Sequence, residues 1–411
     1  MDFIKKYKKY IKPAVIIIAI IIIYKLIVKN SEPFGTNKIF DAGKNKNGAF
    51  EMVKALERYM PGRDYGEKHA ASKQQQKDFV RVIKQIFEKG YTQSFVDKEW
   101  KTWAPSLKNV YKMKIYEAAK KNETLPSTGK SRSYCIFYPI ALDENNKLKN
   151  DMGMLCYANK ADSELVVSCA HSKFDGRIGR QAAQVFAITG ARAAYFSTHH
   201  RYQGLDPSCQ TAYHYDSTDP AHNKGVYYRV HKMIADLFGK DKYKGLEFHG
   251  MGASSCNTCD VYITNGSKEK LVGDAIKLVT EMKKNTDLVI CEPQTGPRCA
   301  LEGGSNIFGR YLNGVPDSDL CKGRPDGKAK KENIMGNFIH IEQKATSWSK
   351  PEQWKDAIIN TFNTNPNETR KRPIINPIIA RQMKCKKKCK KIKNKNKRKK
   401  CINTCNRNKS F

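Results

Sequence analysis

The sequence predicts an α/β fold in which a mainly parallel or mixed sheet is flanked by helices. Between residues 131 and 370, eight short apolar runs alternate with four amphipathic stretches of 10 to 18 residues. Strands that alternate with helices of this length form βαβ units, whose sheets are covered on both faces. Hydrophobic residues make up 40% of the 411-residue chain, which is enough for a substantial core.

The positions of the elements follow from the period of the apolar residues. Strands are predicted at 134–142, 154–158, 164–171, 191–198, 245–249, 260–264, 287–292 and 337–342. Helices are predicted at 180–190, 224–239, 268–285 and 350–362. In such sheets ligands bind at the carboxyl ends of the strands, so polar residues that end a strand are the first functional candidates.

A small helical region is expected before the α/β domain. Residues 74–90 carry apolar side chains at helical spacing, and a second helix is predicted over 106–122, after Pro105. We therefore expect residues 31–130 to form a linker and helical region, and residues 131–370 to form the α/β domain.

The first 30 residues predict a membrane anchor. Sixteen residues lie between Lys12 and Lys29, and Lys25 is the only charged residue among them. A lysine near the end of a span reaches the interface, so residues 13–28 are expected to form a transmembrane helix. No small-x-small cleavage site follows, which favours an uncleaved signal anchor. Five lysines precede the apolar run, so we expect a single-pass protein with a cytosolic N-terminus. The remainder would be lumenal or extracellular, in a cell or virion membrane.

The thirteen cysteines suit an oxidising compartment, where disulfides persist. Cys256 and Cys259 form a CxxC pair, for which we expect a local disulfide beside the site. Further cysteines, at 291, 299 and 321, lie in or beside a Gly- and Pro-rich loop at 292–330. Disulfides are expected to brace this loop as a wall of the site.

The C-terminal segment 371–411 is a basic, cysteine-containing tail. It holds 15 Lys or Arg between residues 381 and 409, a large part of the net charge of +35. Its cysteines form two pairs at i, i+4 spacing, Cys385 with Cys389 and Cys401 with Cys405. This spacing is consistent with a helical hairpin closed by two disulfides. A basic block is usually a solvated tail, and an anionic partner such as nucleic acid or lipid is the functional alternative.

Three predicted strands end on residues of the kinds that hold metals. His171 ends one strand and Asp175 follows it, His249 ends a second, and Glu342 ends a third. Each residue alone is more often structural, but their occurrence at strand ends of one domain favours a site. A hydrolytic zinc site needs about three protein ligands, an open position and a carboxylate base. We therefore predict zinc bound by His171, Asp175 and His249, with Glu342 as the base.

The segments AHSKFDGRIGRQAAQVFAITGARAAYFSTHHR, LEFHGMGASSCNTCDVYITNG and NFIHIEQKATSWSKPEQWKDAI resemble the zinc carboxypeptidase-like superfamily. The nearest branches are the N-formylglutamate amidohydrolases and poly-γ-glutamate hydrolases, and the resemblance covers roughly residues 160–365. It implies a zinc exopeptidase-like fold with the same three ligands and the same base. Asp175 departs from the pattern, since glutamate is commoner at this position in the superfamily.

The resemblance also implies an arginine that binds a substrate carboxylate or the developing oxyanion. Arg201, after two histidines, is the first candidate and Arg177 is the second.

The sequence thus predicts a membrane-anchored zinc amidohydrolase or peptidase that acts on a peptide or an acylated acidic amino acid. One alternative is a cell-wall hydrolase similar to N-acetylmuramoyl-L-alanine amidase. The other is a non-catalytic membrane or virion protein whose basic tail contacts nucleic acid or lipid.

Overall fold

The computed structural model describes residues 48–60 and 71–362, apart from 118–124, 127, 130, 146, 150–151, 199–225, 294–298, 323–327 and 349. The expected membrane anchor at 13–28 and the basic tail at 371–411 lie outside these residues. None of the helices in the described part is both long and apolar enough to span a membrane.

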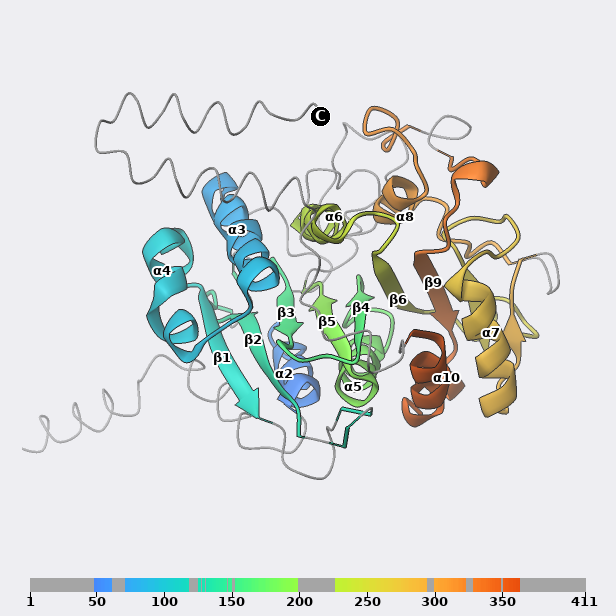
Figure 1. Cartoon of the computed structure of the whole chain (residues 1–411), viewed down its shortest axis with the longest axis horizontal. Helices are drawn as coiled ribbons and strands as arrows, with labels where there is room; N and C mark the ends of the chain where they lie inside the picture. The colour runs from blue at the N-terminus through green and yellow to red at the C-terminus, as the bar shows by residue number, and fades with distance from the viewer. Residues whose placement is uncertain are drawn as a thin grey trace, which may run out of the picture. The chain divides into compact units, whose positions relative to one another are not determined.

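One mixed sheet of nine strands organises the described residues (Figure 1). Its strands are β1 (Tyr111–Glu117), β2 (Ser133–Pro139), β3 (Met154–Tyr157), β4 (Ser163–Cys169), β5 (Ala191–Phe196), β6 (Lys244–Gly250), β7 (Val261–Thr264), β8 (Ile290–Cys291) and β9 (Phe338–Gln343). They lie in the order β1-β2-β3-β5-β4-β6-β9-β7-β8. The central strands β5, β4, β6 and β9 are parallel, and β1 to β3 pair antiparallel with their neighbours. Strand β7 pairs antiparallel with β9 and parallel with β8. The predicted α/β class with a mixed sheet is confirmed.

Helices cover both faces of the sheet. They are α2 (Gly48–Leu56), α3 (Lys73–Lys89), α4 (Trp100–Trp103), α5 (Ile178–Thr189), α6 (Val226–Phe238), α7 (Asp274–Asn285), α8 (Ile307–Leu312), α9 (Ala345–Trp348) and α10 (Glu352–Phe362), with short π or 3₁₀ turns at Phe95–Glu99, Pro105–Leu107 and Lys331–Asn333. Figure 1 shows α3, α6 and α8 on one side of the sheet, and α2, α5, α7 and α10 on the other. The central strands are therefore buried on both faces, which explains their continuous apolar runs.

The predicted helix at 106–122 is wrong, because Tyr111–Glu117 forms β1. This strand pairs with β2 over its whole length, and Tyr111, Met113 and Tyr116 are buried. Backbone pairing and burial against the sheet outweigh the helical propensity of this lysine-rich stretch. The sheet therefore begins before the expected boundary at residue 131.

Helix α3 also belongs to the core of the sheet. It begins at a capping box formed by Ser72 and Gln75, and Gly90 ends it, as the sequence predicts. The ring of Phe79 is fully buried and lies 5.0 Å from that of Tyr111 and 5.3 Å from that of Phe137. These contacts join the helical region to the same hydrophobic core as β1 and β2.

Candidate metal centre

Three of the predicted site residues meet at the carboxyl edge of the sheet. Strands β4 and β6 are parallel neighbours, so their carboxyl ends lie side by side. Nδ1 of His171 lies 2.8 Å from Oδ2 of Asp175 and 3.1 Å from Nδ1 of His249. Nδ1 of His249 lies 3.4 Å from the same Asp175 oxygen. All three side chains are buried, and as a group they can hold a metal ion.

The turn after β4 brings Asp175 back to His171. The backbone N–H of Asp175 donates to the carbonyl of His171, which closes a single turn between the two residues. Gly250, the last residue of β6, donates its backbone N–H to Oδ2 of Asp175 at 3.4 Å. A Cβ at Gly250 would overlap the Asp175 carbonyl oxygen and lie 2.6 Å from Cζ3 of Trp348. Only glycine therefore allows the turn to approach β6 this closely.

Strand β9 adds a second row of ionisable side chains beside β6. Register pairs Glu247 with His340 and His249 with Glu342. Paired residues of neighbouring parallel strands point to the same face, and so do residues i and i+2. Nε2 of His249 lies 2.8 Å from Oε1 of Glu247, and Nε2 of His340 lies 3.7 Å from Oε1 of Glu342. Glu247, His249 and His340 form a second group that can hold a metal ion.

Glu247 is a fully buried carboxylate whose oxygens accept three hydrogen bonds. Tyr227 of α6 donates to Oε2 at 2.8 Å, whereas Asn306, the N-cap of α8, and His249 donate to Oε1. Burial by itself raises the pKa of Glu247, but the hydrogen bond and charge of His249 outweigh it, so the pKa lies below its usual value. The group is therefore a carboxylate at neutral pH.

The charges of the cluster favour a cation at its centre. Burial raises the pKa of Asp175, but His171 and His249 bring it well below the ordinary range. Burial lowers the pKa of His249, but Asp175 and Glu247 raise it well above the ordinary value. Burial and the neighbouring His249 lower the pKa of His340 to about 3, so this imidazole is neutral. Two buried carboxylates thus stabilise positive charge at His249, whether a proton or a metal ion supplies it.

Of the two arginine candidates, only Arg177 lies within the described residues. Arg177 is exposed just before α5. Its charge acts to lower the pKa of Glu57, against the larger raising effect of burial. Arg201 lies in 199–225, outside the described residues.

Two residues of the cluster, Glu247 and His340, were missed from the sequence. The signal was present in the strings LEFHG and FIHIE, which place two ionisable side chains two residues apart on one face of a strand.

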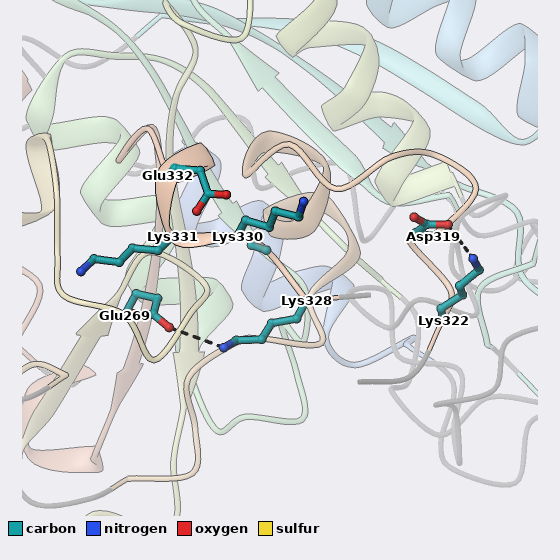
Figure 2. Close-up of a pocket in the computed structure, with 8 residues that line it drawn as sticks. Glu269, Asp319, Lys322, Lys328, Lys330, Lys331 and Glu332 are labelled. Atoms are coloured by element: carbon teal, nitrogen blue, oxygen red, sulfur yellow. Dashed lines mark hydrogen bonds and ion pairs between the residues drawn. The ribbon is translucent and has the colours of Figure 1, made fainter. Parts of the chain in front are cut away.

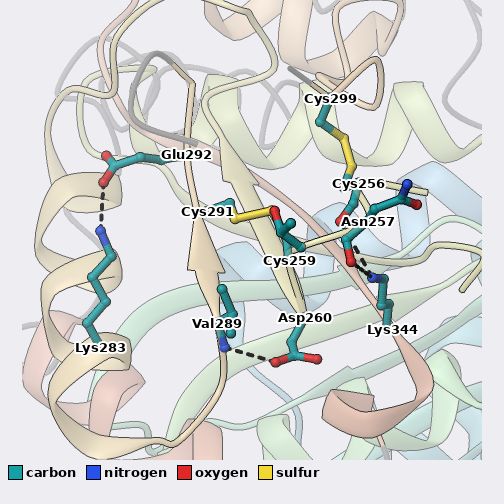
Figure 3. The surroundings of a disulfide bond; sticks show 11 residues. Cys256, Asn257, Cys259, Asp260, Lys283, Val289, Cys291, Glu292, Cys299 and Lys344 are labelled. Atoms are coloured by element: carbon teal, nitrogen blue, oxygen red, sulfur yellow. Dashed lines mark hydrogen bonds and ion pairs between the residues drawn. A yellow bond between two sulfur atoms is a disulfide. The ribbon is translucent and has the colours of Figure 1, made fainter. Parts of the chain in front are cut away.

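Two disulfides join the loop after β6 to β8 and to the segment that follows β8, and neither is a local CxxC bond. Cys256 pairs with Cys299, and Cys259 pairs with Cys291 (Figure 3). The predicted Cys256–Cys259 bond is wrong, because β8 lies beside β7 and brings two other thiols to the loop after β6. The expected bracing of the segment that contains Cys291 and Cys299 is confirmed. From Cys299 the chain continues to Gly303, which lies against the ring of His340.

A separate surface hollow contains none of the metal-binding residues. Its volume is about 700 Å³, and Figure 2 shows lysines and acidic residues around it. Lys328 pairs with Glu269 at 3.5 Å, and Lys322 pairs with Asp319 at 2.8 Å. The hollow offers paired surface charges, so the buried cluster remains the candidate site.

Comparison with known proteins leaves the family open. No family model matches the chain, and no curated protein matches it. A solved structure of a gene product from Agrobacterium tumefaciens is similar over 48% of this chain and 86% of that chain, with 10% identity and a TM-score of 0.28. A likeness this weak carries no argument about function.

Proposed function

We propose that this chain is a zinc-dependent hydrolase of amide bonds, with a peptide or an acylated acidic amino acid as substrate. The supporting observation is the convergence of two imidazole nitrogens and one carboxylate oxygen at the carboxyl edge of the sheet. The resemblance of the surrounding segments to zinc carboxypeptidase-like enzymes agrees with it. We propose, as a separate matter, that residues 13–28 anchor the enzyme in a membrane.

The donor atoms fit the coordination that zinc prefers. Zinc bonds to nitrogen and oxygen of about 2.0–2.2 Å at tetrahedral angles separate neighbouring donors by about 3.3 Å. The three donors of His171, Asp175 and His249 are 2.8 to 3.4 Å apart. Nε2 of His249 faces the Glu247 carboxylate, which leaves Nδ1 as the nitrogen that would bind the metal. Three such ligands leave a fourth position for water or substrate.

Glu342 is the general base in this proposal. It lies beside His249 across the β6–β9 pair. Its side chain is 11% exposed, whereas that of His249 is 4% exposed and that of Glu247 is fully buried. Among these carboxylates and imidazoles it therefore has the best access to a substrate.

Zinc at this site would supply Lewis acidity at the scissile carbonyl and would lower the pKa of nearby water. Glu342 accepts the proton of the attacking water and passes it to the departing nitrogen. His171, Asp175 and His249 would hold the metal, and their burial would exclude bulk water from it.

The non-catalytic alternative receives less support from the energetics. Even when they are paired, buried ionisable groups often contribute no more to stability than apolar residues of similar volume. A purely structural domain gains little from placing Asp175, Glu247, His249 and Glu342 side by side. The array is expected in a protein that uses a metal.

The test measures bound zinc and amide hydrolysis for the full chain and its variants. N-acyl glutamate and γ-linked glutamyl peptides are the substrates. We expect His249→Ala to lose zinc. Glu342→Gln is expected to keep zinc but to lose about 10²- to 10⁴-fold in kcat. Glu352→Gln, an exposed carboxylate change in α10, is the matched control. A wild-type chain that holds no zinc, or a Glu342→Gln variant with full activity, would contradict the proposal.

A further inference from the structure

His249 is shared by two groups that can each hold a metal ion. One contains His171 and Asp175, and the other contains Glu247 and His340. The groups face opposite nitrogens of the ring, since Nδ1 points to His171 and Asp175 whereas Nε2 points to Glu247. The structure therefore allows two arrangements. Either the imidazole of His249 bridges two metal ions, or a single ion binds at His171, Asp175 and His249 while Glu247 holds His249 in place.

The contacts of Glu247 favour the arrangement with a single metal ion. Its two oxygens already accept hydrogen bonds from Tyr227, Asn306 and His249. A carboxylate whose lone pairs accept three N–H or O–H donors is a poor additional metal ligand, because a cation would have to displace those donors. Oε1 of Glu247, which lies 2.8 Å from Nε2 of His249, instead accepts a hydrogen bond from that nitrogen and so keeps the ring proton on Nε2.

The hydrogen-bonded group of Glu247, Tyr227 and Asn306 is rigid because its members belong to different packed elements. The ring of Tyr227 lies 4.5 Å from that of His231 and 5.4 Å from that of Tyr195. Asn306 is fixed as the N-cap of α8, where its side-chain oxygen accepts the N–H of Gly309 at 2.9 Å. Glu247 cannot turn away without breaking contacts to both α6 and α8. Such a partner fixes the tautomer and the orientation of a metal-binding histidine.

We propose that Glu247 is a positioning residue of the metal centre. Together with Tyr227 and Asn306 it holds His249 in the tautomer protonated at Nε2, and this directs Nδ1 toward the ion shared with His171 and Asp175. The group of Glu247, His249 and His340 is then not a second metal site. This inference rests on the metal binding proposed above and adds a residue to that machinery.

The test measures the number of metal ions bound and their dissociation constant in the full chain. Zinc is titrated against a chromophoric chelator, and cobalt(II) reports the ligand geometry through its visible spectrum. We expect one ion per wild-type chain and about 10- to 100-fold weaker binding in Glu247→Ala. The zinc affinity of Glu247→Gln should lie between those of the wild type and Glu247→Ala, because an amide oxygen still accepts the Nε2 proton. His340→Ala should keep one ion.

Asp78→Asn is the matched control for a purely structural effect. Asp78 is also a buried carboxylate with three donors, from Gln74, Arg81 and Ser106, but it lies in the α3 region. This variant should melt at a lower temperature than the wild type and bind zinc equally tightly.

The outcomes separate the two proposals. Two ions per wild-type chain, with one lost in Glu247→Gln or His340→Ala, would show that Glu247, His249 and His340 form a second metal site and would refute the proposal. A Glu247→Ala chain that is folded by circular dichroism and binds zinc as tightly as the wild type would refute the positioning role. A wild-type chain that binds no metal would instead refute the proposed function.

Discussion

Replacement of Gly250 by alanine should separate Asp175 from the other two metal-binding residues. The added Cβ would overlap the carbonyl oxygen of Asp175 and lie 2.6 Å from Cζ3 of Trp348. Carbon atoms in contact usually lie about 3.5–4.0 Å apart, so the turn or the indole must move by about 1 Å. Coordination distances tolerate changes of only about 0.2 Å. A shift of this size is therefore enough to remove Asp175 from a metal that His171 and His249 hold.

Two quantities follow for this variant. Overpacking at a constrained contact costs about 1–3 kcal/mol of folding free energy, so the melting temperature should fall by several degrees. Zinc affinity should fall about tenfold or more, because even the loss of a residue that only positions a ligand typically costs about 10- to 100-fold. Calorimetry measures the first quantity and competition with a chromophoric chelator measures the second.

Gly252→Ala is the matched control, two residues further along the same chain. A Cβ there would meet only Oγ of Ser255, at an ordinary 3.5 Å. We expect its stability and zinc affinity to match the wild type. If Gly250→Ala and Gly252→Ala bind zinc equally well, the close approach of the turn to β6 does not position Asp175, and the reasoning is wrong.

Three further predictions concern the fold around the site. Phe79→Ala should cost about 3–5 kcal/mol in urea unfolding, because the ring is fully buried between α3 and the sheet; a separate early transition of α3 would show that it is not part of this core. Burial lowers the pKa of His231 from 6.5 to about 4, so the unfolded chain binds more protons than the folded chain between these pH values. The free energy of unfolding should therefore fall as the pH drops through this window, by about 3 kcal/mol in full. His231→Phe should remove that part of the pH dependence of unfolding, and an unchanged slope between pH 6.5 and 4 would count against it. Cys259→Ser should lower stability by about 2–4 kcal/mol and weaken zinc binding, because the Cys259–Cys291 bond ties the loop that leads to Asn306; an unchanged melting temperature would exclude this bracing role.

Much of the candidate site could be anticipated because its residues end strands. The apolar runs before His171 and His249 predict buried strands, and parallel strands carry their carboxyl ends to one edge. Once β4 and β6 are neighbours, these two histidines must lie close together. Asp175 comes with His171 because a single turn joins them. Local sequence and one rule of sheet geometry are sufficient for this part.

The remaining members depend on contacts between distant segments. Strand β9 lies beside β6 although almost ninety residues separate Gly250 from Phe338. Hydrophobic period does not reveal strand order, so it could not show that His340 pairs with Glu247. For the same reason it could not show which cysteines meet.

The sequence by itself determined the alternation of strands and helices and the polar residues at strand ends, because these follow from local periodicity. The tertiary structure decided that 111–117 is a strand, since only its pairing with β2 makes the extended form favourable. It also decided that Glu247, buried beneath α6 and α8, accepts the Nε2 proton of His249. That role requires side chains from three elements to meet, and only packing of the whole domain brings them together.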